Sequence, residues 1–174
     1  AIPALERDLS DQGFHMLEAV NTDNLMLASS DETVRSALAA MNYTVISEVA
    51  ILDAVGVGGY QRRWEVENHE FFHELMRRSE RSRKMVCIIG DTGERTLAVQ
   101  EKLAEMFPRI TWAAYALDLA AGGADSVVNE INAEAPDVLL SILPSPAQET
   151  FVLENKDKLL ASLWYGIGTM SLAR

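Results

Sequence analysis

One acidic residue of this chain stands where an α/β enzyme could carry a general base. Asp53 follows the apolar run 43–52 and comes just before the glycine-rich segment 56–59. A carboxylate that is half-buried at the end of a strand can have a raised pKa and accept a proton from a substrate hydroxyl. Glycines such as Gly56 let a substrate approach the backbone closely. The simpler alternative is an aspartate that hydrogen-bonds its own loop.

A second group of polar residues lies in the C-terminal third of the chain. The turn Pro144-Ser145-Pro146-Ala147-Gln148-Glu149 follows the apolar run 138–143 and precedes a predicted helix. Ligands of open α/β sheets bind beside the carboxyl ends of the strands. We therefore expect Pro146, Gln148 and Glu149 to line a ligand site. We also expect Asp53 to face Gln148 across a crevice at that edge of the sheet.

Gly90-Asp91-Thr92-Gly93 is a third candidate, because it joins a predicted strand to a predicted helix. The first N–H groups of a helix have no partner within it and can hold an anion. A turn that is simply capped by Asp91 or Thr92 is the alternative. The segment lacks the three spaced glycines of dinucleotide-binding loops. Its Asp-Thr-Gly triplet also occurs in aspartic proteases, but there it lies among strands only, so we exclude that class.

The string His69-Glu70-Phe71-Phe72-His73 matches the zinc-protease pattern letter for letter. Such a site needs a third ligand, and no histidine follows His73. We therefore favour a solvated helix face and expect no metal. A cluster of cations ends this helix, where it complements the helix dipole. The sequence has no Asp-x-Asp pair for a metal–diphosphate clamp.

Composition indicates one soluble domain, residues 1–174. Of its residues 48% are hydrophobic and 24% charged, and the formal net charge is -11. That charge argues against broad binding to nucleic acid or to anionic membranes. The lone Cys87 lies in an apolar run, which favours a buried thiol and allows no disulfide within the chain. We expect no leader peptide and no membrane span, and hence a cytoplasmic protein.

Apolar runs alternate with helical patterns along most of the chain. This alternation predicts a Rossmann-like, three-layer α/β/α fold with a mostly parallel sheet. A break near Ser29-Ser30 divides the first helix, and Asp31 can cap its second part. The expected helices are 23–41, 68–84, 92–107, 124–133 and 148–160, and the expected strands are 43–52, 85–89, 110–116, 138–143 and 163–167.

The C-terminal half resembles the WecG/TagA/CpsF family of bacterial glycosyltransferases. The resemblance rests on shared motifs in the family's order: Gly90, Phe107-Pro108, Ile131-Asn132, Pro136-Asp137, Pro146-Ala147-Gln148-Glu149 and Gly166-Ile167-Gly168. The N-terminal half matches more weakly. Asn21 looks like a family asparagine, and Asp53-Ala54-Val55-Gly56 looks like the family's Asp-Gly-x-Gly without its first glycine.

The resemblance implies a Rossmann-like, inverting transferase that needs no metal or cofactor. Family members move N-acetylmannosamine or a related sugar from a UDP-sugar to a lipid-linked acceptor in cell-envelope polysaccharide synthesis. Carried over, Asp53 is the general base. The implied substrate-binding residues are Asn21, Gly56, Gly90, Asp91, Pro146, Gln148 and Glu149. The resemblance implies a cytoplasmic protein, located at the inner face of the membrane with at most peripheral contact. It is also compatible with a homo-oligomer.

Three departures from the family pattern support an alternative function. Ala19 stands where the family has a threonine, and Pro144 where it has a glycine. Family enzymes also continue with an arginine-bearing segment, whereas this sequence ends at Arg174. The alternative is an inactive relative that binds a nucleotide sugar or serves as an assembly module.

Overall fold

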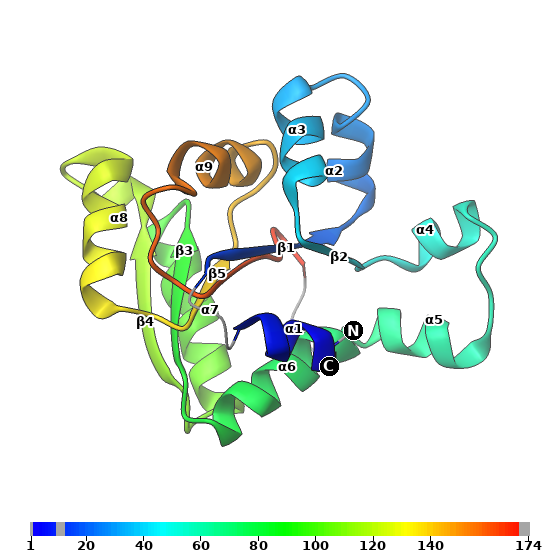
Figure 1. Ribbon diagram of the computed structural model, residues 1–174, viewed down its shortest axis with the longest axis horizontal. Helices are drawn as coiled ribbons and strands as arrows, with labels where there is room; N and C mark the ends of the chain where they lie inside the picture. The colour runs from blue at the N-terminus through cyan, green and yellow to red at the C-terminus, as the bar shows by residue number, and fades with distance from the viewer. Residues whose placement is uncertain (1, 10–12, 171–174) are drawn as a thin grey trace.

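The computed structural model describes residues 2–9 and 13–170. In this part of the chain one sheet holds six parallel strands in the order β2-β1-β6-β5-β3-β4 (Figure 1). The strands are β1 (His15–Val20), β2 (Tyr43–Ile46), β3 (Met85–Gly90), β4 (Thr111–Ala116), β5 (Val138–Ser141) and β6 (Leu163–Gly166). The predicted three-layer, Rossmann-like fold is confirmed.

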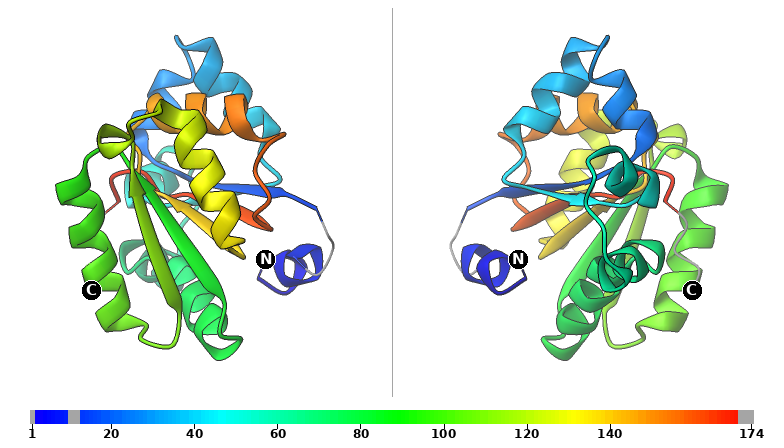
Figure 2. Two further views of the ribbon diagram at one scale, coloured as in Figure 1. Left: turned by 90° about the vertical axis from the view of Figure 1, so that its left-hand side faces the viewer. Right: turned by 90° about the vertical axis from the view of Figure 1, so that its right-hand side faces the viewer.

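Helices cover both faces of the sheet (Figure 2). One face carries α1 (Ile2–Leu9), α6 (Glu70–Arg81) and α7 (Gly93–Met106). The other carries α3 (Glu32–Ala40), α8 (Gly123–Glu134) and α9 (Ala147–Asn155). The remaining elements are α2 (Thr22–Leu27), α4 (Val49–Ala54), α5 (Tyr60–Glu67) and the short 3-10 helix η1 (Leu117–Leu119).

The apolar strands read as continuous runs because both of their faces are buried. In β3, Val86 and Ile88 join the core beneath α6 and α7, while Cys87 and Ile89 join the core beneath α8 and α9. Cys87 is a free, buried thiol, as predicted. The predicted caps are also confirmed, because Asp31 caps α3 and Thr92 caps α7.

Strands β3 and β5 are neighbours in the sheet, but the chain leaves them toward opposite edges. It passes from β3 to β4 at one edge, and from β5 to β6 on the other side. The helix that follows β3 packs on one face, and the helix that follows β5 packs on the other. Parallel crossovers are right-handed, so the two connections leave these strands in opposite directions. This arrangement makes a switch point, the place where open α/β sheets bind ligands beside the carboxyl ends of their strands.

The predicted strand 43–52 is wrong in its second half. Strand β2 ends at Ile46, and α4 begins at Val49. Ser47 closes the strand, because its N–H and its hydroxyl both donate to the Val20 carbonyl at 2.9 Å. Asp53 therefore lies in the last turn of α4 and not at the end of a strand. The sequence prediction also missed α1, β1 and α5.

No helix in the described ranges is long and apolar enough to cross a bilayer.

The turn after β3 requires a glycine at position 90. A Cβ added to Gly90 would lie 2.0 Å from Thr96 Oγ1 and 3.1 Å from the Ile142 side chain. We predict that Gly90→Ala lowers the free energy of unfolding by about 1–3 kcal/mol, because a packed core resists added atoms. Urea unfolding measures the change. The control is Gly58→Ala, where the added atom meets nothing within 4 Å. Equal stability of the two variants would contradict this packing.

Candidate functional site

Gln148 is a buried bridge between three segments at the switch-point edge of the sheet. Its Oε1 accepts hydrogen bonds from Ser141 Oγ at 2.9 Å and from the Gly168 N–H at 3.1 Å. Its Nε2 donates to Glu18 Oε1 at 3.1 Å. Only 1% of Gln148 is exposed. The side chain that was expected to line a ligand site thus holds together the ends of β5, β6 and β1.

The bridge explains why Gly166 lacks a side chain. A Cβ at Gly166 would lie 2.5 Å from the Trp164 ring and 2.9 Å from Gln148 Nε2. Gly168 has a φ of 62°, a backbone conformation that glycine adopts without strain. The last two motifs of the family resemblance, Pro146-Ala147-Gln148-Glu149 and Gly166-Ile167-Gly168, are therefore in direct contact through one amide.

Two acidic side chains are completely buried beside this amide. Burial, followed by the nearby charge of Glu149, raises the pKa of Glu18 to about 8, and the hydrogen bond from Gln148 opposes the rise. Burial likewise raises the pKa of Glu149, opposed by its hydrogen bond from Ser145 Oγ. Glu18 therefore carries its proton at neutral pH. Its Oε2 is buried without a hydrogen-bond partner among the described residues.

Arg95 joins the end of β3 to the same edge. Its Nη1 donates to the Ile142 carbonyl, and its Nη2 donates to the Gly168 carbonyl at 3.2 Å. Nη1 also lies 3.4 Å from Asp91 Oδ1. The side chain is one-third exposed where β3, β5 and β6 end, and two backbone carbonyls and Asp91 already contact its guanidinium. Arg95 is not predicted from the sequence, because a single arginine inside a helix has no distinguishing pattern.

Side chains of the protein already accept hydrogen bonds from the backbone N–H groups at the Gly90-Asp91-Thr92-Gly93 turn. The Thr92 N–H donates to Asp91 Oδ1, and the Gly93 N–H donates to Asp118 Oδ1, both at 2.9 Å. The Arg95 N–H donates to Thr92 Oγ1 at 3.3 Å. The capped turn, left open as an alternative by the sequence, is therefore present. An anion could reach the Gly93 N–H only by displacing the Asp118 carboxylate.

Asn21 and Pro146 also lie at the carboxyl edge of the sheet. Asn21 caps α2, where its side chain accepts from the Asn24 N–H at 2.8 Å. Its Nδ2 would be 4.0 Å from a Cβ built on Gly168. Pro146 follows a cis peptide bond and immediately precedes α9. The structure thus gathers Asn21, Gly90, Asp91, Pro146, Gln148 and Glu149 along one edge.

Asp53 and Gly56 lie apart from this group. The Asp53 side chain is 62% exposed and forms an ion pair with Arg63 at 2.5 Å. Helix α4 projects away from the sheet, whereas α9 lies over it (Figure 1). The expectation that Asp53 and Gln148 face one another across a crevice is wrong, because one side chain points into solvent and the other is enclosed. The role of Asp53 as a base stays a prediction.

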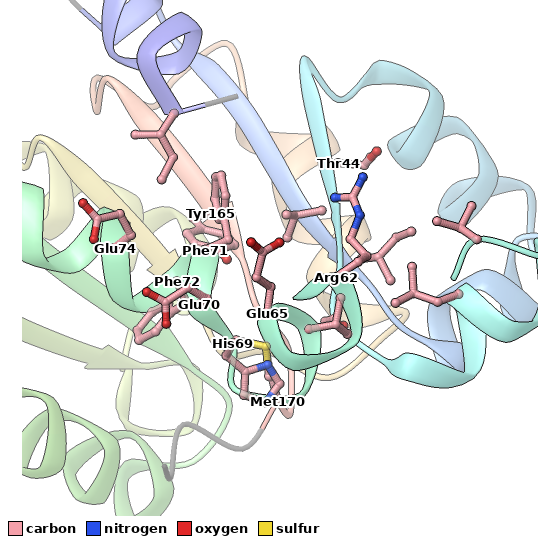
Figure 3. A pocket seen from close by; sticks show the side chains of 17 residues that line it. Thr44, Arg62, Glu65, His69, Glu70, Phe71, Phe72, Glu74, Tyr165 and Met170 are labelled. Atoms are coloured by element: carbon pink, nitrogen blue, oxygen red, sulfur yellow. The ribbon is translucent and has the colours of Figure 1, made fainter. Parts of the chain in front are cut away.

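A cavity lies between the end of β2 and helices α4, α5 and α6 (Figure 3). Its volume is about 590 Å³. Phe71 and Tyr165 form part of its wall, with ring centroids 6.1 Å apart in an edge-to-face contact. Figure 3 shows Glu65 extending from α5 into the same space. Further lining residues are Val45, Ser47, Leu52, Val57, Arg62, Val66, His69, Glu70 and Met170.

His69 supplies a neutral polar group to this cavity. It precedes α6 with a φ of 51°, and burial lowers its pKa, so the imidazole is uncharged near neutral pH. Its Nδ1 is buried without a hydrogen-bond partner in the described residues. A mostly apolar pocket with a few polar groups is typical of small-molecule sites. The arrangement suits an uncharged ligand surface.

His69 and His73 do not form the solvated helix face that the sequence predicts. His73 is 2% exposed and contacts the rings of Phe72 and Phe107, with centroids 5.5 and 6.1 Å away. The apolar side of α6 faces the core, and His73 lies on that side. Residues 2–9 and 13–170 contain no group of three His, Cys, Asp or Glu side chains arranged to hold a metal ion.

Comparison with known sequences gives one family. The model of the glycosyl transferase WecG/TagA/CpsF family matches residues 2–171, which is nearly the whole chain. No curated protein sequence matches the chain significantly. The matched region includes the switch-point edge, the buried acids and the cavity beneath α4 and α5.

The buried position of Glu18 predicts a specific pH dependence of stability. The folded chain keeps this proton until pH about 8, whereas an unfolded glutamate loses it near 4.5. The unfolded state therefore binds fewer protons between these values, so the free energy of unfolding falls as pH rises. We predict that Glu18→Gln removes a fall of at least about 1 kcal/mol over this interval.

Urea unfolding at several pH values tests this assignment. The control is Glu101→Gln, because Glu101 is exposed on α7 and its replacement should leave the pH profile unchanged. A Glu18→Gln profile that is identical to the wild-type profile would show that Glu18 is not the group that titrates.

Proposed function

Because the chain belongs to the glycosyl transferase WecG/TagA/CpsF family, we propose that it transfers an N-acetylmannosamine-type sugar from a UDP-sugar to a lipid-linked acceptor. Membership itself implies a glycosyltransferase role in cell-envelope polysaccharide synthesis. The observation that carries the proposal is the family match over residues 2–171. The sugar, the nucleotide and the acceptor belong to the proposal, as does a cytoplasmic place at the inner face of the membrane.

The donor binds, in this proposal, at the switch-point edge. Asn21, Gly90 and Asp91 lie at the carboxyl ends of β1 and β3, the usual position of ligands in such sheets. Arg95 is one-third exposed there and can pair with a diphosphate, which has to be held locally in a chain with a net charge of -11. Gln148 acts as a positioning residue, because it fixes the Gly168 backbone that Arg95 also contacts.

Glu149 and Pro146 have a positioning role of the same kind. Glu149 is buried and accepts from Ser145 Oγ, which lies in the turn after β5. Pro146 stiffens that turn immediately before α9. Both residues therefore shape the turn whose backbone borders the proposed donor site, and neither needs to touch the sugar.

The acceptor occupies the cavity beneath α4 and α5. Its apolar and aromatic wall suits the uncharged part of an acceptor, and His69 is among its lining residues. Gly56 lies next to Val57, which lines the cavity, so the loop backbone borders the acceptor. The diphosphate of a lipid-linked acceptor would stay outside, because Glu65 and Glu70 are among the lining residues.

Asp53 accepts the proton of the attacking hydroxyl. In an inverting displacement this oxygen attacks the anomeric carbon, the bond to the diphosphate breaks, and UDP leaves. Leu52, the preceding residue, lines the cavity, whereas Asp53 itself faces solvent and must turn toward the acceptor before it can act. The carboxylate must exchange Arg63 for the hydroxyl before it can act. No step requires a metal ion.

Two observations favour the inactive relative as a second candidate. Asp53 is exposed and ion-paired, and Ala19, where the family has a threonine, is buried in the apolar core. A chain that keeps the donor edge without a working base would bind a nucleotide sugar and not turn it over.

Release of UDP from UDP-N-acetyl sugars in the presence of a lipid-linked acceptor tests the proposal. We predict that Asp53→Asn lowers kcat at least about 100-fold, the usual contribution of a general base. The matched control is Asp125→Asn, an exposed aspartate that is also paired with a cation, Lys158. Its kcat should be unchanged.

Calorimetric titration with UDP and UDP-N-acetyl sugars distinguishes the two candidates. Binding together with turnover supports the transferase, and binding without turnover by the wild-type chain supports the inactive relative. Absence of binding would overturn both the donor site and the function.

A further inference from the structure

We propose that the segment 49–67, the α4–α5 arm, contacts a lipid bilayer through its outward side chains. Nine large hydrophobic side chains are exposed in the described part of the chain, and four of them lie between residues 55 and 64. Val55 is 60% exposed, Val57 42%, Tyr60 85% and Trp64 39%. Concentrations of exposed apolar side chains mark surfaces that are covered by a partner.

Tyr60 and Trp64 share one side of α5, because they are four residues apart, whereas Val57 also lines the cavity. A Cβ added at Gly56, Gly58 or Gly59 would meet nothing within 4 Å, so the loop between α4 and α5 lies open to solvent. Figure 1 shows the arm projecting from the side of the sheet, beyond the edge formed by β2. A projecting loop can reach a flat surface that the body of the molecule cannot touch.

The side-chain types fit a bilayer interface. Tyrosine and tryptophan are enriched at membrane interfaces, where their rings meet the acyl region and their polar atoms meet the headgroups. Arg63, the partner of Asp53, lies next to Trp64 in sequence, and an arginine at such a depth extends toward lipid phosphates, whereas Arg62 lines the cavity. The arm also carries Asp53, Glu65 and Glu67, so the contact depends on rings and not on net charge.

The inner side of the arm forms the cavity assigned to the acceptor. Leu52, Val57, Arg62, Glu65 and Val66 line that space. The outward rings and the cavity thus lie on opposite sides of one short segment. This inference rests on the proposed function in one respect: a lipid-linked acceptor is held in a bilayer, and docking of the arm would bring the cavity to it.

Co-sedimentation with phosphatidylcholine vesicles tests the contact directly. We predict that the full chain sediments with vesicles and that the double variant Tyr60→Ser/Trp64→Ser partitions at least about tenfold less, a change of about 1.4 kcal/mol. The matched control is Leu119→Ser/Leu160→Ser, which removes two side chains that are 71% and 72% exposed elsewhere. Circular dichroism verifies that each variant is folded.

Two further measurements sharpen the test. Trp64 is exposed, whereas Trp164 is buried and Trp112 is partly buried, so a blue shift of the emission on vesicle addition reports Trp64. Sedimentation should persist at raised salt, because the arm is not a basic patch.

Three outcomes would overturn the inference. The first is that the wild-type chain does not bind vesicles, and the second is that the arm and control variants lose vesicle binding equally. The third is that the chain binds no vesicles but forms a dimer that the arm variant abolishes. The last would assign the surface to a second copy of the chain. Turnover with a water-soluble acceptor separates this question from the proposed function, because it needs no vesicle. Turnover without vesicle binding rejects only the arm contact, and vesicle binding without turnover rejects only the transferase.

Discussion

The architecture of the carboxyl edge depends on one buried amide. Gln148 accepts from Ser141 and Gly168 and donates to Glu18, so a single side chain connects β5, the loop after β6, and β1. A buried amide is stable only when its polar atoms are paired, and each partner here is itself enclosed or held in the backbone. The network therefore requires a small residue at 166, and burial keeps the proton on Glu18 against the opposing effect of the hydrogen bond from Gln148.

This constraint bears on the two sites that we propose, a donor site at the carboxyl edge and an acceptor site in the cavity. The interior of the edge is rigid and polar, and its outer surface offers Arg95 beside the ends of β3, β5 and β6. The cavity is different in character, because aromatic and aliphatic side chains dominate it and its histidine is neutral. An anionic nucleotide fits the first environment, and the uncharged part of an acceptor fits the second. The segment after β6 joins the two places, because Gly168 belongs to the edge and Met170 to the cavity.

The fold was largely predictable, and the failures have identifiable physical causes. Four strands beginning near residues 85, 110, 138 and 163 were recognised because they are apolar runs between turn residues. Strand β1 was missed because Glu18 interrupts its apolar pattern, and only burial with a retained proton permits it there. The run 43–52 was misassigned in part, since a short apolar run fits a strand or a buried helix equally well.

The candidate site was predictable only where it coincides with local motifs. The Gln148 turn and the Gly90 turn were found, but their inward hydrogen bonds depend on tertiary partners that no local pattern reveals. The cavity was missed because its walls come from β2, α4, α5, α6 and β6, which are distant in sequence. The family match supports the transferase role more firmly than any single side chain does.

A crystal structure of the chain with UDP tests the central claim most directly. The account predicts a nucleotide at the carboxyl ends of β3 and β5, with its diphosphate within hydrogen-bond distance of Arg95 and Gln148 still enclosed. A nucleotide held instead in the cavity beside His69 and Tyr165, with the switch-point edge empty, would contradict it.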